Sequence, residues 1–398
     1  MSKLIGTGGF GCVYYPSLKC KEPQPDSFYE NKISKLITNS DAKSELKQYT
    51  IIDNLDKNNL YHLGKPVSCQ VDYKQNKELI DQCDLQKIIN QKKKLTLLVE
   101  KNGGYDLYKL FFVIEPKDFI RIIPSFFTNF KGMFSVVEIM IKNKYSHRDL
   151  RPENIVYSLQ TGKFNLIDFG LFRHMNTIIY SEHMFNLPFE YSFLSELSFK
   201  KIKEKKKPYC QNRLNQQLQI LYNYCFIPEL DPFFHIKIYE GLKSTISSIQ
   251  ENKITYDEFR SKSLNTFDVY GLGFTLLYIL KKTHSYINPF FCKELYHFAF
   301  SMINSNLESR ITIDMAISKY DQIINTYFVT PPFQKSFSVS SKKSIHSSIN
   351  KTAKTICNKK DNKELNPFTG RYNKTCKKGY HRNSKFKCVS NKKTNNIK

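Results

Sequence analysis

The 398-residue chain contains no tryptophan, no C-x-x-C pair among its ten cysteines and no run of about 20 consecutive apolar residues. The last absence excludes a membrane span, and the N-terminus lacks a signal-peptide pattern. We therefore expect an intracellular, soluble protein. Without C-x-x-C spacing, the cysteines are expected to be free thiols in a reducing compartment. A hydrophobic content of 40% is enough to bury a core.

The net charge of +25 is unevenly placed. From Ser338 to Lys398 there are 17 Lys and Arg against Asp361 and Glu364, which gives +15 and leaves +10 for the rest of the chain. The tail is therefore expected to be a separate part of the protein. Residues 333–364 are rich in Ser and Lys and predict a flexible linker, and residues 365–398 are expected to form a small module.

The most informative pattern is H-R-D-L-R-P-E-N over residues 147–154, followed by D-F-G over residues 168–170. Between them, residues 155–157 and 164–167 predict two short strands, which would bring both motifs together. Phosphoryl transfer needs a group that orients the incoming hydroxyl and oxygen ligands that hold Mg²⁺. Asp149, Asn154 and Asp168 fit these roles. Any one of them alone is more readily explained as a solvated loop residue, but their combination indicates a phosphoryl-transfer site.

A glycine-rich string near the start of the chain has the form G-x-G-x-x-G-x-V. Dinucleotide-binding folds use a similar string, but there it opens a helix, whereas residues 12–15 are β-branched and aromatic and predict a strand. Its small residues would let backbone amides fold over phosphates. The expected nucleotide-binding residues are Ile5, Gly6, Thr7, Gly8, Gly9, Phe10, Gly11, Cys12 and Val13.

Together these motifs resemble the eukaryotic protein kinase family. The resemblance implies a two-lobed α+β fold, with a small β-rich N-lobe over residues 1–101 and a large, mainly helical C-lobe over 102–332 that carries an insertion at about 195–262. It also implies ATP and Mg²⁺ as cofactors and proteins as substrates. Asp149 would accept or orient the substrate hydroxyl, Asn154 and Asp168 would hold Mg²⁺, and Arg151 would supply positive charge. Serine/threonine members usually carry Lys at the position of Arg151. Because Arg151 retains this positive charge, the resemblance favours Ser/Thr specificity.

In this family a lysine on the third strand anchors the phosphates and pairs with a helix glutamate. The usual V-A-I-K string is missing here. Lys35 alternates with apolar neighbours in a strand-like run, and Ser40 is expected to cap a following helix on which Glu45 is the natural partner. Three other lysines remain alternatives to Lys35, namely Lys19, Lys21 and Lys32.

Two further segments fit the same fold. Residues 95–107 combine an apolar strand with a Gly pair, as in the hinge whose backbone binds adenine, although an ordinary exit from a strand would look the same. Four apolar residues at helical spacing predict an amphipathic helix under the catalytic loop, namely Phe130, Phe134, Val137 and Ile141.

The large lobe has its own signatures. L-P-F-E over residues 187–190 stands where the family has A-P-E, and Arg310 is the expected partner of Glu190. The sequence from Asp268 to Gly273 resembles the D-x-W-x-x-G that opens a buried helix, with Tyr270 in place of the tryptophan. The 77 residues between Glu190 and Asp268 are more than a compact kinase needs. Within them, the lysine-rich run 200–207 predicts a solvated loop, with substrate docking as the other possibility.

Arg148, beside Asp149, suggests that the segment from Gly170 to Glu190 is ordered by phosphorylation. The candidate acceptors are Thr177, Tyr180 and Ser181.

The tail pattern N-P-F-T-G-R, with Cys376 and Cys388, resembles the two-cysteine adaptor module that iridovirus-like cytoplasmic DNA viruses attach to kinases. This resemblance implies tethering to a viral or host protein, in the host cytoplasm or with the virion. Two cysteines cannot complete a zinc site within one module. The rival interpretation is a nucleic-acid contact through the dense positive charge, with three aromatic residues stacking on bases, namely Tyr372, Tyr380 and Phe386.

Two other classes stay open. A pseudokinase scaffold would keep the fold and lose turnover, and the missing V-A-I-K string favours it. A kinase-like small-molecule phosphotransferase would share the Asp and Asn, but the H-R-D triplet, residues 188–190 and Asp268 favour protein substrates.

Overall fold

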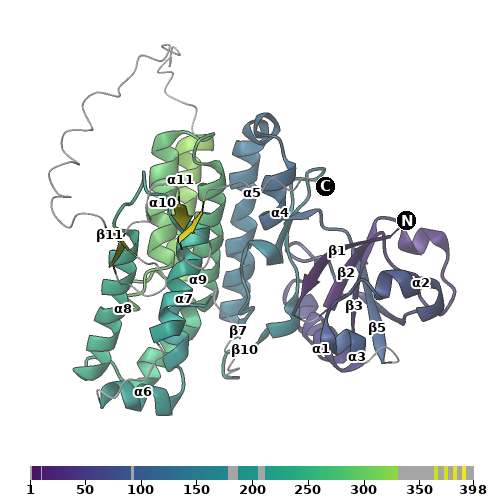
Figure 1. The fold of residues 1–398 in the computed structure, drawn as a ribbon, viewed down its shortest axis with the longest axis horizontal. Coiled ribbons are helices and arrows are strands. Elements are labelled where there is room, and N and C mark those ends of the chain that lie inside the picture. The colour runs from purple at the N-terminus through teal and green to yellow at the C-terminus, as the bar shows by residue number, and fades with distance from the viewer. Residues whose placement is uncertain are drawn as a thin grey trace. The chain divides into compact units, whose positions relative to one another are not determined.

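The computed structural model describes residues 2–9, 11–90, 94–177, 187–204 and 211–329, together with four short strands of the tail. The chain divides into two compact units, residues 1–331 and 332–398. The first unit has an N-terminal antiparallel sheet with helices on both faces, followed by a mainly helical lobe (Figure 1). The predicted two-lobed α+β fold is therefore confirmed.

The sheet of the N-terminal lobe has the strand order β1-β2-β3-β5-β4. Successive side chains of a strand point to opposite faces, so Lys35 and Leu36 on β3 face different sides of the sheet. In register, Lys35 lies beside Leu98 of β5. The strands are β1 (Lys3–Gly8), β2 (Gly11–Tyr15), β3 (Lys32–Thr38), β4 (Val67–Gln70) and β5 (Leu95–Lys101).

Helices cover both faces of this sheet. On the face that carries Lys35, α1 (Asn39–Leu55) contributes Ala42 to a small cluster with Ile37 and Leu98. On the opposite face, α2 (Tyr73–Ile80) and α3 (Gln86–Asn90) cover a larger cluster. This larger cluster includes Tyr14, Leu36, Ile80, Ile88 and Leu97.

The helix α1 follows β3 without a loop. Thr38 has extended backbone angles and is the N-cap, because its side chain accepts a hydrogen bond from the backbone N of Asp41 at 3.2 Å. The predicted cap, Ser40, lies in the first turn, with its Oγ 3.0 Å from Thr38 Oγ1. That prediction is wrong because the strand continues up to Thr38.

Four cysteines of the N-terminal lobe form disulfides, Cys12 with Cys83 and Cys20 with Cys69. The expectation of free thiols is therefore wrong for these residues. The partners are 71 and 49 residues apart in sequence, but the fold brings their Cα atoms to 6.0 and 5.8 Å. Cys83 reaches β2 because the connection from β4 to β5 carries α2 and α3 across the sheet. In the described part of the helical lobe, the free cysteines are Cys225 and Cys292, both buried.

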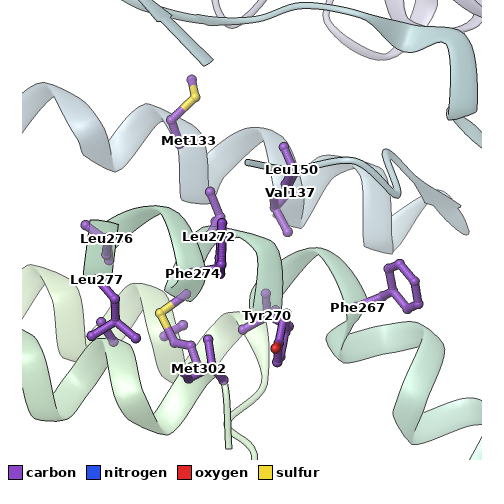
Figure 2. Close-up of a cluster of buried hydrophobic side chains, with 14 of the residues drawn as sticks. Met133, Val137, Leu150, Phe267, Tyr270, Leu272, Phe274, Leu276, Leu277 and Met302 are labelled. Carbon is purple, nitrogen blue, oxygen red and sulfur yellow. The ribbon is translucent and has the colours of Figure 1, made fainter. Parts of the chain in front are cut away.

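The centre of the helical lobe is α9 (Tyr256–Thr283), which packs between α5 (Pro116–Lys142) and α10 (Pro289–Met302) (Figure 2). At Gly271 an added Cβ would lie 2.6 Å from Leu150 Cβ, so only glycine allows this close approach. A capping box of Thr255 and Glu258 starts the helix, 12 residues before the expected start at Asp268. That boundary was wrong because the apolar run marks only the most buried part of a longer helix.

Other predicted elements are present. The helix predicted from Phe130 to Ile141 is the second half of α5, and Phe130 and Phe134 are fully buried. The two predicted strands are confirmed, and they form a three-stranded sheet with β6. These strands are β6 (Tyr105–Asp106), β8 (Ile155–Tyr157) and β9 (Phe164–Leu166). A separate pair is formed by β7 (Tyr145–Ser146) and β10 (Arg173–His174). The lobe also contains α4 (Leu107–Val113) and α11 (Ile313–Ile324).

The insertion is helical in its described residues, with α6 (Glu196–Lys203), α7 (Gln211–Cys225) and α8 (Phe234–Gln250). Residues 205–207 of the lysine-rich run lie outside the described residues. The part from Lys200 to Lys203 belongs to α6, whose Phe199 and Ile202 are buried while the lysines are exposed. The expectation of a loop is wrong here because two apolar residues three apart bury one face of the helix.

The second unit contains two antiparallel hairpins. β11 (Lys363–Leu365) pairs with β12 (Tyr372–Lys374), and β13 (Tyr380–Arg382) pairs with β14 (Cys388–Ser390). β11 thus begins two residues inside the expected linker. Residues 330–362, Cys376 and Phe386 lie outside the described residues. Among the helices that the structure describes, none has the length and apolar character needed to span a bilayer.

Arg310 tests the stability of the helical lobe. Its guanidinium forms a buried, two-pronged ion pair with Glu190, as predicted, with Nη2 3.0 Å from Oε2. We expect Arg310→Met to lower the free energy of unfolding by about 3–5 kcal/mol, because Glu190 would remain buried without its partner. Urea unfolding followed by circular dichroism measures this. The control is Arg121→Met, which removes an exposed pair with Asp118 and should cost less than about 0.5 kcal/mol. Equal effects of the two variants would contradict the prediction.

Candidate active site

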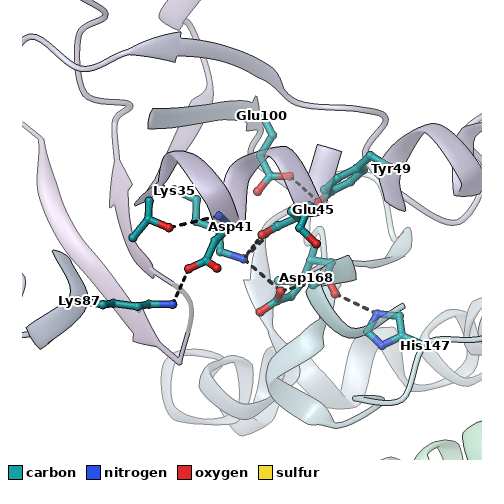
Figure 3. Close-up of polar contacts among 12 residues, drawn as sticks. Lys35, Asp41, Glu45, Tyr49, Lys87, Glu100, His147 and Asp168 are labelled. Carbon is teal, nitrogen blue, oxygen red and sulfur yellow. Dashed lines mark hydrogen bonds and ion pairs between the residues drawn. The ribbon is translucent and has the colours of Figure 1, made fainter. Parts of the chain in front are cut away.

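Lys35 lies between two carboxylates from different parts of the chain (Figure 3). Its Nζ is 2.9 Å from Glu45 Oε2 on α1 and 3.0 Å from Asp168 Oδ1, which follows β9. Lys35 is 8% exposed and Glu45 is 3% exposed. The predicted contact between Lys35 and Glu45 is present, and Lys19, one of the alternatives, instead pairs with Asp26 near the surface. The structure therefore brings Lys35 into the site.

The charges in this cluster are coupled. Burial alone would lower the pKa of Lys35, but the carboxylates of Asp168 and Glu45 outweigh it and raise that pKa above its ordinary value. Burial alone would raise the pKa of Asp168, but Lys35 holds it below its ordinary value. Lys35 is therefore a fixed cation and Asp168 a fixed anion at neutral pH.

The loop of residues 147–154 is hydrogen-bonded to α9. The carboxylate of Asp268 accepts hydrogen bonds from the backbone N of His147 at 2.7 Å and of Arg148 at 3.0 Å. Arg148 has a φ of 68°, in the left-handed region, and these bonds help to hold the loop in this conformation. The loop then presents Asp149 and Asn154 together. Asn154 Nδ2 donates to the backbone O and to Oδ2 of Asp149, each at 2.8 Å.

The oxygens suited to a divalent cation come from Asn154 and Asp168. Because Nδ2 of Asn154 faces Asp149, its amide oxygen is the remaining donor atom. Asp168 uses Oδ1 for Lys35 and for the backbone N of Gly170, and no hydrogen bond to Oδ2 is formed within the described residues. Carboxylate and amide oxygens are ligands that Mg²⁺ accepts. Among the described residues no cluster of three His, Cys, Asp or Glu forms a second candidate.

Aromatic rings connect the two motifs to α1. Phe169 lies 5.1 Å from the ring of Tyr49 and 5.2 Å from the ring of His147, measured between centroids. Phe169 is fully buried. The helix that carries Glu45 is therefore packed against both Asp168 and the loop of Asp149.

The glycine-rich segment spans β1 and β2. Ile5, Gly6, Thr7 and Gly8 lie on β1 and Gly9 in the turn, while Phe10 lies outside the described residues. Gly11 begins β2, and an added Cβ there would lie 2.4 Å from the backbone O of Leu36, so a side chain cannot fit. Val13 pairs in register with Lys35. From the helical lobe, Lys109 Nζ donates to the backbone O of Ile5 at 2.7 Å.

The side chain of Cys12 faces away from Lys35. Its side chain is fully buried, bonded to Cys83, and packs in the cluster under α2 and α3, on the face of the sheet opposite Lys35. In this structure only its backbone remains for contact with a nucleotide.

Comparison with known proteins agrees with this geometry. Residues 1–187 match the protein kinase domain family. The chain resembles the eukaryotic-type serine/threonine protein kinases. It is 30% identical over 182 residues to a probable serine/threonine-protein kinase of fowlpox virus (strain NVSL), FPV226, covering 43% of this chain and 52% of that protein. It is also 30% identical over 96 residues to a probable serine/threonine-protein kinase cdc7 of Dictyostelium discoideum, covering 20% of this chain and 9% of that protein. The chain thus spans about half of the length of the fowlpox virus protein and about a tenth of the length of the Dictyostelium protein.

The kinase hinge was expected in residues 95–107. The strand is present as β5, and Gly104 follows it with a φ of 98°. An added Cβ at Gly104 would lie 2.2 Å from the backbone O of Tyr157. Both the positive φ and this close approach therefore require glycine. Adenine binding by this segment stays a prediction.

The side chain of Arg148 bonds to the backbone of the segment after D-F-G. Arg148 Nη2 donates to the carbonyl oxygens of His174 at 2.9 Å and of Met175 at 3.5 Å. Thr177 ends the described part of this segment, and Tyr180 and Ser181 lie outside it. Phosphorylation of the segment stays a prediction.

Sequence reasoning missed Glu100. This residue ends the apolar part of β5 and, by alternation, faces the same side as Leu98 and Lys35. Tyr49 Oη donates to its Oε2 at 3.3 Å (Figure 3). Burial, followed by repulsion from Glu45, raises the pKa of Glu100 to about 7. An acidic residue closing an otherwise apolar strand was the available signal.

Replacing Glu100 should change the pH dependence of stability. The pKa of this acid is raised from 4.5 to about 7 in the folded protein, so the folded state binds the extra proton and stability falls as pH rises between these values. Glu100→Gln keeps a hydrogen-bond acceptor for Tyr49 and removes the charge. We expect the variant to match the wild type at pH 5 and to exceed it by about 1–3 kcal/mol at pH 8. Urea unfolding at both pH values measures this, and parallel pH profiles would contradict it.

Proposed function

We propose that this chain is an ATP-dependent protein kinase that transfers the γ-phosphoryl group of ATP to serine or threonine hydroxyls of protein substrates. The observation that carries the proposal is a set of contacts among five side chains from four segments of the chain. Lys35 contacts Glu45 and Asp168, while Asn154 contacts Asp149. The family match over residues 1–187 supports the same conclusion.

Each side chain has a role that its contacts support. Asp149 would accept or orient the substrate hydroxyl, and Asn154 would hold that carboxylate in place through its Nδ2. Lys35 would contact the nucleotide phosphates, and Glu45 would keep it oriented. The oxygens of Asp168 and Asn154 would hold Mg²⁺, which when bound neutralises charge on the phosphates. The glycine-rich backbone from Ile5 to Val13 would cover the phosphates.

Arg151 supports serine/threonine specificity only through the family resemblance. Its Nε lies 3.6 Å from Asp149 Oδ1, so it places positive charge beside the candidate base. The similarity to the fowlpox virus protein supports a viral kinase acting in the host cytoplasm or in the virion. The two hairpins of the tail would then tether a viral or host protein.

Asp149→Asn should abolish turnover. The variant keeps the hydrogen-bonding shape and loses the basic oxygen, so we expect transfer of labelled phosphate from ATP to a general protein acceptor to fall at least roughly 100-fold. Phosphoamino-acid analysis of the wild-type product should give phosphoserine and phosphothreonine. Phosphotyrosine as the main product would refute the specificity, and an inactive wild type would favour the pseudokinase scaffold.

Lys35→Met should also lose at least roughly 100-fold in phosphate transfer, because the buried cation would be missing from the phosphates. Its matched control is Lys32→Met, which removes a lysine from the same strand and should stay within about two-fold of the wild type, since it leaves the ion pairs of Lys35 intact. Circular dichroism checks that both variants fold. Retained activity in Lys35→Met would refute its role.

A further inference from the structure

The helix α7, part of the unusually long segment between Glu190 and α9, is firmly attached to the centre of the helical lobe. Lys281 of α9 donates from Nζ to the carbonyl oxygens of Tyr222 at 3.0 Å and Asn223 at 2.8 Å. These bonds satisfy carbonyl groups at the C-terminal end of α7, which have no partner within the helix. Cys225 is fully buried, with its Sγ 3.8 Å from the carbonyl oxygen of Phe274. The C-terminal end of α7 is therefore held against α9 by several hydrogen bonds.

Tyr224, in the last turn of α7, contacts the loop of residues 147–154. Its ring lies 5.4 Å from Phe274 and 5.5 Å from Tyr278, measured between centroids, and its Oη donates to Glu153 Oε1 at 3.1 Å. Glu153 sits in the loop between Arg151 and Asn154. A residue of the insertion thus contacts the segment that carries the candidate base.

The contact continues towards Asp149. Glu153 Oε2 lies 3.8 Å from Arg151 Nε, which lies 3.6 Å from Asp149 Oδ1. Within the described residues, Glu153 Oε2 and Arg151 Nε are buried and have no hydrogen bond at normal distance. Arg151 is therefore shared between two carboxylates and fully held by neither. The hydroxyl of Tyr224 fixes one oxygen of Glu153 and so limits how closely that carboxylate can approach Arg151.

The same helix also contacts the segment that ends at Glu190. Gln217 Nε2 donates to the carbonyl oxygen of Leu187 at 3.1 Å, and Gln217 is only 3% exposed. Since Leu187 begins the L-P-F-E sequence, α7 touches both the catalytic loop and the chain that leads to Glu190. A merely solvated insertion would make neither contact.

We propose that α7 is a built-in support of the active site and that Tyr224 is a positioning residue, which acts on Asp149 through Glu153 and Arg151. This inference rests on the proposed kinase function. Without the Tyr224 hydroxyl, Glu153 turns towards Arg151 and draws it away from Asp149. The chemical step then slows, while nucleotide binding changes little, because neither Tyr224 nor Glu153 is among the residues proposed to hold the nucleotide or Mg²⁺.

Tyr224→Phe tests the proposal, because it keeps the ring contacts and removes only the hydroxyl. We expect kcat to fall roughly 10- to 100-fold, the size expected for losing a hydrogen bond to a charged group. KM for ATP should stay within about two-fold. The matched control is Tyr222→Phe, two residues away on the same helix, whose ring is partly exposed and stacks on Phe226; it should keep wild-type kcat and KM.

A double-mutant cycle with Glu153→Gln separates positioning from simple loss of stability. If Tyr224 acts through Glu153, Tyr224→Phe should change kcat by less than about two-fold in the Glu153→Gln background. Equal loss in both backgrounds would overturn the proposal. If Tyr224→Phe folds poorly, Glu153→Asp, which keeps the charge but shortens the side chain and so breaks the hydrogen bond to Tyr224, must lower kcat at unchanged KM for ATP, and wild-type kcat in that variant would also overturn the proposal.

The outcomes distinguish the two proposals. An active wild type with an equally active Tyr224→Phe variant would refute the role of Tyr224 and leave the kinase function standing. An inactive wild type would refute the kinase function, and the role of Tyr224 with it.

Discussion

The loop of residues 147–154 depends on one carboxylate, that of Asp268 in the middle of α9. Asp268 is 2% exposed and accepts two backbone hydrogen bonds from the loop. The position of residues 147–154 is therefore set by a side chain in the core of the lobe. A buried carboxylate without these donors would be costly, which makes helix and loop mutually dependent. The close contact of Gly271 with Leu150 reinforces this joint. Asp149 and Asn154 are in place because α9 is.

The other half of the site has an excess of negative charge. Lys35 contacts both Glu45 and Asp168, and Glu100 lies on the same side of the sheet. One cation near three acids leaves this half of the site electronegative, which favours the binding of a divalent cation. Repulsion from Glu45 adds to burial in raising the pKa of Glu100.

Local signals predicted much of this arrangement. The strands β8 and β9, the buried half of α5 and the pairing of Arg310 with Glu190 follow from motifs whose spacing is set by the short chain between them or by the fold that they resemble. The contact of Lys35 with Glu45 was predicted despite the missing V-A-I-K string, because alternation on β3 leaves few positions that face α1.

Features that depend on tertiary contacts were missed. The disulfide from Cys12 to Cys83 needs α2 and α3 to lie over the sheet, and nothing near either cysteine reveals that. The contact of Tyr224 with Glu153 joins residues 71 apart that belong to an insertion and a loop. The start of α9 was misplaced because its first turns are amphipathic and only its centre is uniformly apolar. Long-range packing decided each case.

Two polar side-chain contacts between the lobes differ in their access to water. The bridge from Lys35 to Asp168 is largely shielded, whereas Lys109, which bonds to Ile5 on β1, has a side chain that is 49% exposed. Water competes readily for the second contact and poorly for the first. The lobes should therefore part first at the glycine-rich edge and swing about the buried bridge, so that ligand exchange leaves the alignment of the reacting groups undisturbed.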